Sequence, residues 1–223
     1  MHPRTVGRPP RRTPVCPRLA FHSNAVQERR PHRAFTLIEL LVVIATIGIL
    51  LGVAVPSLFS VYERARKTQA KNDLTQIVTA VNAFYTEYGK YPLATSDAYI
   101  TDTSTPSNAD LFYTLRAQPF GLNVGNVANP RQIVYISPRV LGTTPARSGI
   151  GSNGQFYDPW GTPYQVAIDG VYNNQITTNP YGNNTGAGPS PLPQGVIGWS
   201  LGKDQTLGNG GVFTGSDDVI SWQ

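Results

Sequence analysis

The sequence is poor in the side chains that carry out covalent and metal chemistry. Its single cysteine, Cys16, and its three histidines all fall within the first 34 residues. Residues 35–223 therefore lack Cys–His and Ser–His–Asp nucleophile systems, and they lack zinc sites built on histidine. No Gly-x-x-x-x-Gly-Lys-Ser/Thr phosphate loop occurs, and one cysteine excludes a disulfide within the chain. These absences argue against an enzyme.

Charge is also scarce, at 14% of residues, and it is unevenly distributed. Residues 1–34 hold eight arginines and one glutamate, a balance of +7, whereas the rest of the chain holds 10 basic and 12 acidic residues, a balance of −2. The first 34 residues are rich in proline and show no apolar periodicity, which predicts a disordered leader. The negative balance of the remainder argues against phosphate-driven binding of nucleic acid.

Residues 35–55 form an apolar run, FTLIELLVVIATIGILLGVAV, whose only charge is Glu39. About 20 apolar residues suffice to cross the roughly 30 Å hydrocarbon core of a membrane as a helix. The arginines before the run place that side in the cytoplasm and the C-terminal part outside. A carboxylate within a membrane is costly and functional by default. Glu39 either reaches the interface or meets a positive partner, such as a free α-amino group.

Helical periodicity continues beyond the apolar run. Gly48 and Gly52 form a G-x-x-x-G pair that lets two helices approach closely, and Pro56 is expected to kink the helix or loosen a turn. Farther on, apolar residues recur at steps of three and four: Leu74, Ile77, Val78, Val81, Phe84, Tyr85 and Tyr88. This spacing is typical of an amphipathic helix, which Gly89 and Pro92 should end.

Residues 90–223 are rich in Thr, Ser, Asn, Gly and Pro with short apolar runs, which predicts a globular β domain. Ser107 and Asp110 fit a capping box for a short helix that follows them. Residues 117–155 are interpreted as loop with one short strand, at 132–136.

The segment YDPWGTPY predicts a turn fixed by Pro159 and Gly161. Trp160 and Tyr164 should bury their rings against the long helix. Two more strands are expected, at 164–168 and 196–201. An Asn/Gly/Pro-rich insertion, at 173–194, separates them.

Together these features resemble the type IV pilins and the type II secretion pseudopilins. The shared features are basic residues, then the small residue Ala34, then the start FTLIE of an apolar run; YDPWGTPY resembles the DPWGxPY segment of major pseudopilins. The resemblance implies that a dedicated peptidase cuts between Ala34 and Phe35 on the cytoplasmic side and N-methylates Phe35. Ala34 replaces the glycine usual in the family. An ordinary secretory signal is the alternative, but its apolar region has 7–15 residues and precedes the cut.

The resemblance also implies a fold and an assembly segment. The fold is α+β, with a long N-terminal α-helix that spans the membrane in its first half and packs on a small C-terminal antiparallel β-sheet. Four parts are expected: a cleaved leader, a membrane half of the helix, a soluble half and a periplasmic domain, at 1–34, 35–56, 57–89 and 90–223. In this family the glutamate at the position of Glu39 pairs with the amino terminus of a neighbouring subunit. The expected assembly residues are Glu39, Gly48, Gly52 and Pro56.

The C-terminal stretches SLGKD and SDDVISW are similar to the SLGxDG…DDI…W stretch that holds a calcium ion in major pseudopilins. The resemblance implies carboxylate ligands from Asp204 and from one or both of Asp217 and Asp218, with a backbone carbonyl from Leu201. Calcium takes six to eight oxygen ligands in flexible loops, which fits this composition. Gln205 stands where the family has glycine. The alternative is an exposed polar hairpin whose acids only keep it soluble.

The resemblance implies a structural subunit of a type II secretion pseudopilus, a helical filament that drives protein export. Such a subunit is a single-pass protein of the bacterial inner membrane with its C-terminal domain in the periplasm. The implied partners are further copies of the chain, prepilin peptidase, the inner-membrane assembly platform and minor pseudopilins. Two alternatives remain: a type IV pilin for adhesion, motility or DNA uptake, and a membrane-tethered binding domain that never polymerises.

Overall fold

The computed structural model describes residues 35–101, 104–183 and 185–223. The leader, which includes Ala34, lies outside the described residues, so its disorder stays a prediction. Contacts divide the chain into two compact units, Met1–Ile49 and Leu50–Gln223.

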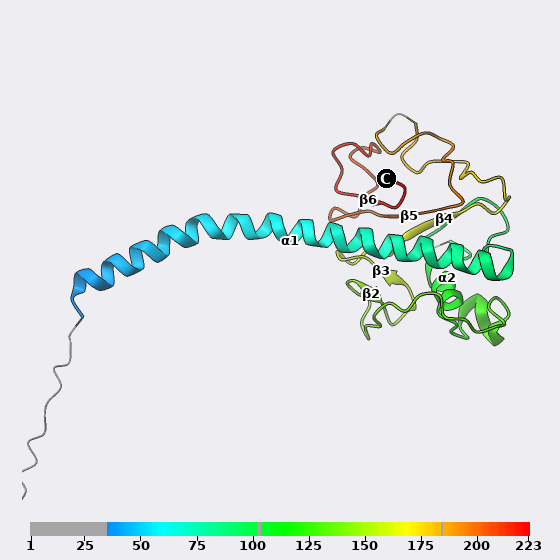
Figure 1. The fold of residues 1–223 in the computed structure, drawn as a ribbon, viewed down its shortest axis with the longest axis horizontal. Coiled ribbons are helices and arrows are strands. Elements are labelled where there is room, and N and C mark those ends of the chain that lie inside the picture. The colour runs from blue at the N-terminus through cyan, green and yellow to red at the C-terminus, as the bar shows by residue number, and fades with distance from the viewer. Residues whose placement is uncertain (1–34, 102–103, 184) are drawn as a thin grey trace, which may run out of the picture. The chain divides into compact units, whose positions relative to one another are not determined.

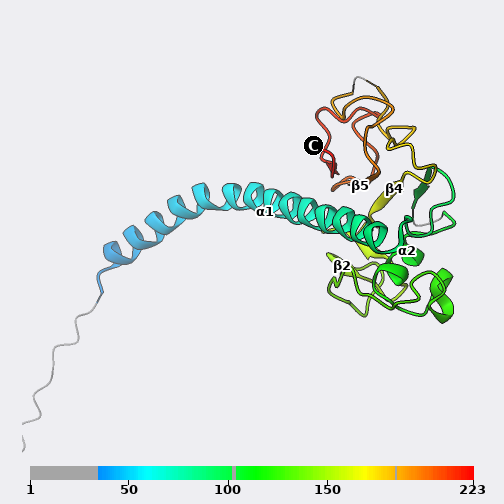
Figure 2. The same ribbon diagram turned by 45° about the vertical axis from the view of Figure 1, so that its right-hand side comes forward.

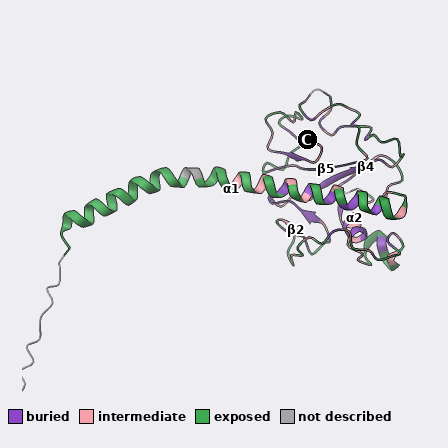
Figure 3. Ribbon diagram, viewed as in Figure 1, coloured by how far each residue is buried: buried purple, intermediate pink, exposed green. Residues whose placement is uncertain are grey.

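Helix α1, Leu37–Tyr88, begins in the first unit and ends in the second (Figure 1). Within the first unit its described residues are all exposed and mostly apolar (Figure 3). The helix contains a segment long and apolar enough to cross a membrane. The backbone remains helical through Pro56, although proline supplies no N–H to the carbonyl four residues earlier.

In the second unit α1 is amphipathic, as predicted. Its buried apolar residues are spaced by three or four positions and form one face (Figure 3): Ala70, Leu74, Ile77, Ala80, Val81 and Phe84. Tyr85 was expected on this face, but it is 40% exposed and stacks on Tyr91 with ring centroids 4.6 Å apart. The helix ends at Tyr88 as predicted. Gly89 follows with a φ of 66°, a left-handed conformation that favours glycine, and its N–H binds the carbonyl of Tyr85 at 2.8 Å.

A four-stranded antiparallel sheet forms the centre of the globular domain. Its strands, in spatial order, are β1 (Ala98–Ile100), β4 (Gln165–Ile168), β5 (Val196–Ser200) and β6 (Val219–Ile220). The register places Ala167 opposite both Tyr99 and Ile197, and Trp199 opposite Ile220. The strands expected at 164–168 and 196–201 are confirmed to within one residue, as is the α+β fold of a long helix against an antiparallel sheet.

Both faces of this sheet are buried. Val166 and Ile168 of β4 belong to a core shared with α1, whereas Ala167 belongs to a second cluster with Ile197 and Trp199. The strands thus alternate between two cores, and every residue of β4 is buried. In the globular unit, α1 lies between the sheet and a layer that contains α2, while residues 173–183 and 185–194 and the C-terminal segment lie beyond the sheet (Figures 1 and 2).

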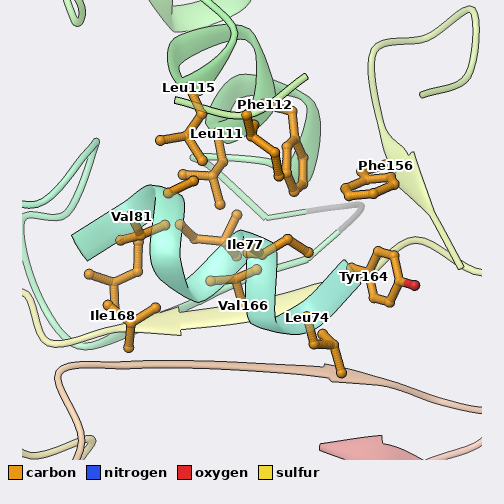
Figure 4. Packing of buried hydrophobic residues seen from close by; sticks show 14 of the residues in the cluster. Leu74, Ile77, Val81, Leu111, Phe112, Leu115, Phe156, Tyr164, Val166 and Ile168 are labelled. Atoms are coloured by element: carbon orange, nitrogen blue, oxygen red, sulfur yellow. The ribbon is translucent and has the colours of Figure 1, made fainter. Parts of the chain in front are cut away.

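Helix α2, Asn108–Leu115, begins with the predicted capping box. The N–H of Asp110 donates to Ser107 Oγ at 3.3 Å, and the N–H of Ser107 donates to Asp110 Oδ2 at 3.0 Å. Residues from α1, α2 and β4 meet in one core (Figure 4): Leu74, Ile77, Val81, Leu111, Phe112, Leu115, Val166 and Ile168. Full burial of each such side chain contributes about 1.5–3 kcal/mol relative to exposure.

The strand expected at 132–136 is wrong. The N–H and carbonyl of Ile133 bond to the side chain of Asn129 at 3.2 and 2.8 Å, and the N–H of Tyr135 donates to the carbonyl of Leu115 at 2.9 Å. These partners occupy three backbone groups that a strand would pair with a neighbouring strand. The 117–155 region instead contains a 3-10 helix and a strand that pairs with the next one: η1 (Gly121–Asn126), β2 (Gly149–Ile150) and β3 (Phe156–Tyr157).

Candidate functional site: assembly segment and acidic loop

The first turn of α1 is closed by a capping box that includes Glu39. Its Oε2 accepts the backbone N–H of Thr36 at 2.9 Å and the Thr36 hydroxyl at 2.8 Å, while Thr36 Oγ1 accepts the N–H of Glu39 at 3.3 Å. Thr-x-x-Glu at the start of an apolar run is a helix-start signal, and sequence reasoning missed it here. Both hydrogen bonds that Glu39 accepts from Thr36 go to Oε2, which leaves Oε1 of Glu39 without a partner among the described residues.

Gly48 and Gly52, which are expected to act in assembly, lie along the exposed part of α1, and Phe35, at the expected cleavage site, lies just before it. Phe35 is 81% exposed, and nothing stands within 4 Å of the place that a Cβ would take at Gly48 or Gly52. Leu50 and Phe59 are 69% and 70% exposed. A helix surface this apolar needs lipid or other helices to cover it.

The loop between β5 and β6 brings the three predicted acidic ligands together. Side-chain oxygens of Asp204, Asp217 and Asp218 lie within 4.8 Å of one another. Two oxygens that bind one calcium ion at about 2.3–2.6 Å are at most about 5 Å apart. The three carboxylates are therefore close enough together to hold a single metal ion. Leu201 is half-buried directly after β5, and its carbonyl stays a predicted ligand.

Hydrogen bonds hold one oxygen of each acidic side chain. Asp204 Oδ1 accepts the N–H of Thr206. Asp217 Oδ2 accepts the N–H groups of Lys203 and Asp204. Asp218 Oδ2 accepts the N–H of Gly208 and the hydroxyl of Tyr181. Asp218 is 6% exposed, and its Oδ1 is buried without a hydrogen-bond partner in the described part of the chain. A cation would satisfy this oxygen, which is otherwise costly to bury.

Burial raises the pKa of Asp218. The hydrogen bonds from Tyr181 and Gly208 lower that pKa, while the negative charges of Asp217 and Asp204 raise it further. The cluster therefore holds a carboxyl group whose ionised form is disfavoured both by burial and by the neighbouring acids. A bound cation would reverse that balance.

Six residues of the acidic loop adopt left-handed backbone, and Gln205 is the only one of them that is not glycine. Gly202 has a φ of 66°, and a Cβ there would lie 2.8 Å from Cγ of Asp217, so only glycine fits. Gln205 has a φ of 60° at the position where the pseudopilin pattern has glycine. A non-glycine residue in this conformation costs about 1–2 kcal/mol. The departure from the pattern thus stores strain beside Asp204.

The YDPWGTPY segment turns around a buried carboxylate. Asp158 is fully buried, and its Oδ1 accepts three backbone N–H groups at 2.8–2.9 Å: Trp160, Gly161 and Thr162. Its Oδ2 accepts the hydroxyl of Ser200 at 2.5 Å. Burial raises the pKa of Asp158 despite these four donors. Sequence reasoning credited the proline and glycine of the turn and missed Asp158, although an aspartate that opens a turn is a recognised signal.

The turn is fastened to α1 by its two aromatic residues, as predicted. Trp160 is 6% exposed and Tyr164 is fully buried. Trp160 Nε1–H donates to Glu63 Oε2 at 3.1 Å, and the Tyr164 hydroxyl donates to Asp73 Oδ2 at 2.9 Å. Burial raises the pKa of Asp73, and the bond from Tyr164 opposes that shift.

Helix α1 also holds the C-terminal end of the acidic loop. Lys71 Nζ donates to the carbonyl of Ile220 at 2.7 Å and to that of Ser221 at 3.4 Å. Because β6 follows Asp218 directly, this lysine fixes the strand that carries the buried acid.

Comparison with known proteins connects the chain to a family. Residues 29–55 match the prokaryotic N-terminal methylation motif. The type II secretion system core protein G of Aeromonas hydrophila is 32% identical over 145 residues, which cover 65% of this chain and 79% of that protein. The chain belongs to the type IV pilin-like family of pilins and pseudopilins. The predicted resemblance is thereby confirmed.

Other relatives of this pilin-like chain differ in how far the likeness extends. Core protein G of Pseudomonas aeruginosa is 29% identical over 144 residues, 65% of this chain and 79% of that protein. The type IV major pilin protein PilA of Myxococcus xanthus is 40% identical over 60 residues, so the chain spans only 27% of that relative. No solved structure matches.

Family membership bears on the class and the location of the chain. Pilins and pseudopilins are structural proteins and not enzymes, in agreement with the prediction from sequence. One long apolar N-terminal helix with a methylation motif is the arrangement of a pilin-like protein anchored in the inner membrane. The motif, residues 29–55, includes Ala34, Phe35 and Glu39.

Proposed function

We propose that this pilin-like chain is a structural subunit of a type II secretion pseudopilus and polymerises into a filament that drives protein export. The extent of the likeness carries the proposal. A match of 145 residues to core protein G is longer than the leader and α1 together, so it includes part of the globular domain. The match to PilA has 60 residues, and the match to the fimbrial protein EcpC of Eikenella corrodens has 128 residues at 29% identity, against 145 residues at 32% for core protein G. The YDPWGTPY turn, which resembles the major pseudopilin segment, adds support.

On this proposal, prepilin peptidase cuts between Ala34 and Phe35 on the cytoplasmic side and Phe35 is N-methylated. The methylation motif at 29–55 supports the site. The capping box of Thr36 and Glu39 lies wholly after the cut, so the helix keeps its cap when the leader leaves. The mature subunit then stays in the inner membrane through α1, with its globular domain in the periplasm.

Cleavage creates a charge that Glu39 is placed to meet. The new α-amino group adds positive charge at a helix N-terminus that already carries partial positive charge. Glu39 is the only charged residue of the apolar run, and its Oε1 is open among the described residues. We assign Oε1 to the amino group of a neighbouring subunit, because an unpaired charge in an apolar filament interior is costly.

The remaining assembly residues shape the contact between helices. Gly48 and Gly52 have open space around them and would let a second helix approach closely. Pro56 removes one backbone hydrogen bond at the end of the apolar run. The proposed partners are other copies of the chain, prepilin peptidase, the inner-membrane assembly platform and minor pseudopilins.

We also propose that the acidic loop binds calcium. The ligands are the carboxylates of Asp204, Asp217 and Asp218 and the carbonyl of Leu201, with Asp218 Oδ1 as the buried oxygen that lacks another partner. Ordering a loop rich in glycine costs conformational entropy. An ion that binds only the folded loop would offset that cost.

The filament proposal is tested by cross-linking within cells. Cysteine pairs at exposed α1 positions, such as Val43→Cys with Ile49→Cys, should give ladders of cross-linked subunits only if helices from many copies lie side by side. Glu39→Ala should insert into the membrane but give no ladder. The matched control, Thr36→Ala, loses the capping hydroxyl and keeps Glu39, so it should still give ladders. Ladders from Glu39→Ala, or their loss in both variants alike, would contradict the pairing of Glu39 with a neighbour.

A type IV pilin is the second candidate, favoured by the 40% identity to PilA over 60 residues. The two candidates differ in phenotype. Deletion of the gene in its own bacterium should abolish secretion of type II substrates and leave motility and DNA uptake unchanged. Loss of motility or DNA uptake with normal secretion would favour the pilin.

A further inference from the structure

The insertion between β4 and β5 folds over the outer face of the sheet. We call its described residues, 173–183 and 185–194, the strap. Its two ends are joined because Ile176 and Leu192 exchange backbone hydrogen bonds at 2.9 and 3.0 Å. Four of its residues are buried in the second core together with β4, β5 and β6: Ile176, Tyr181, Ala187 and Leu192. The strap and the C-terminal segment lie side by side beyond the sheet (Figures 1 and 2).

The strap also contacts the acidic loop and the chain that follows it. The carbonyl of Thr185 accepts both the N–H and the hydroxyl of Thr214, at 2.9 and 3.0 Å. The carbonyl of Ala187 accepts Trp222 Nε1–H at 2.6 Å. The hydroxyl of Tyr181 donates to Asp218 Oδ2 at 2.7 Å. The last contact joins the strap to an acid of the proposed ion site.

Tyr181 is held in place from several sides. It is 3% exposed, and its ring packs edge-on against Phe213 with centroids 5.3 Å apart. The side chain of Asn179, itself 1% exposed, accepts the N–H of Tyr181 at 3.1 Å and donates to the carbonyl of Ala187 at 3.2 Å. These contacts fix the ring of Tyr181, whose hydroxyl donates to Asp218 Oδ2.

We propose that the strap is a positioning element for the ion site, in which Tyr181 holds Asp218 Oδ2 so that Oδ1 faces the cation. The proposal rests on the calcium site proposed above. Tyr181 and the N–H of Gly208 together occupy Oδ2, while Oδ1 stays buried without a partner among the described residues. A carboxylate fixed at one oxygen presents the other in a set direction, as groups behind metal ligands commonly do.

The competing explanation is that the strap only covers apolar surface of the sheet. A matched control distinguishes this explanation from the positioning role. Tyr99, on β1, also donates its hydroxyl to the strap, to the carbonyl of Thr178 at 2.7 Å. Both Tyr181→Phe and Tyr99→Phe remove one hydroxyl and keep the ring. Only the first removes a bond to an acid of the cluster.

The experiment measures the dissociation constant for calcium by titration calorimetry on the full-length, detergent-solubilised chain with calcium chloride. Tyr181→Phe should weaken calcium binding about tenfold, and Tyr99→Phe should leave it within about twofold. Binding by Tyr181→Phe that equals or exceeds wild-type binding overturns the positioning role and leaves the ion site standing. Wild-type protein that binds no calcium overturns the ion site and the positioning role together. Equal weakening in both variants also overturns the role of Tyr181, since it points to general loosening.

A second measurement needs no variant and therefore does not depend on whether Tyr181→Phe folds. Calcium should slow hydrogen exchange of the wild-type chain at backbone amides of the strap within 179–183 and 185–187, as well as in the acidic loop. If calcium slows hydrogen exchange only at residues 201–218, the strap does not respond to the ion and the positioning role is contradicted.

Discussion

The buried carboxylate of Asp158 makes a quantitative prediction about the globular domain. Asp158→Ala removes the acceptor of three backbone N–H groups and of the Ser200 hydroxyl. The N–H of Gly161 keeps a second acceptor, the Asp158 carbonyl at 3.2 Å, and the serine hydroxyl can rotate. Two N–H groups, those of Trp160 and Thr162, lose this acceptor, at about 1–3 kcal/mol each.

Removal of the buried carboxylate also offsets part of this loss in the free energy of unfolding. Burial raises the pKa of Asp158 and so disfavours its ionised form. We therefore expect Asp158→Ala to lower the free energy of unfolding by about 3 kcal/mol. For a domain of this size that corresponds to a fall in melting temperature of about 6–12 °C. The assay is thermal unfolding of the full-length chain in detergent, followed by tryptophan fluorescence.

Asp158→Asn is the matched control. Its side-chain oxygen can still accept the backbone N–H groups, and its amide can donate to Ser200, so the loss should be about 1 kcal/mol. The reasoning is refuted if Asp158→Ala loses less than about 1 kcal/mol, or if the two variants lose the same amount.

Three further predictions concern the acidic loop and α1. Gln205→Gly should raise the melting temperature in the absence of calcium by relieving about 1 kcal/mol of left-handed strain, and a lower melting temperature would refute this. Calcium should raise the melting temperature of the wild-type chain, and Asp204→Ala should abolish that rise; a melt of the wild-type chain that calcium leaves unchanged contradicts the site. Because burial raises the pKa of Asp73, stability should increase as the pH falls from neutral through that raised pKa and level off near the unfolded value of about 3.9. Asp73→Asn should reduce this increase, measured by chemical unfolding across pH, and an increase of unchanged size would exclude Asp73 as a source.

Long periodic segments were predictable from the sequence. The end of α1 at Tyr88, the box of Ser107 and Asp110, and strands β4 and β5 all follow from local pattern. These signals lie within a few residues of the elements that they determine. Local reading therefore suffices where periodicity or a cap decides the structure.

The shorter strands were not predictable, because β1, β2, β3 and β6 have only two or three residues and no period can be read from them. The error at 132–136 has a different origin. The residues QIVYI have strand propensity, yet Asn129 and Leu115 satisfy backbone groups there, and tertiary context overrides propensity.

The candidate ion site was predictable in its ligands and not in its support. Asp204, Asp217 and Asp218 followed from resemblance, and the fold brings them together. Tyr181 stands 37 residues before Asp218, and the Ser200 hydroxyl stands 42 residues after Asp158. No local spacing connects such pairs, so only the folded chain reveals them.

The start of the mature chain is the most direct test of a processed, polymerising subunit. The measurement is intact mass and N-terminal sequencing of the protein isolated from the membranes of a bacterium that has prepilin peptidase. The account predicts a chain that begins at Phe35 with one methyl group on its α-amino nitrogen. A chain that begins after Val55, or one that keeps its arginine-rich leader while it supports secretion, would contradict the account.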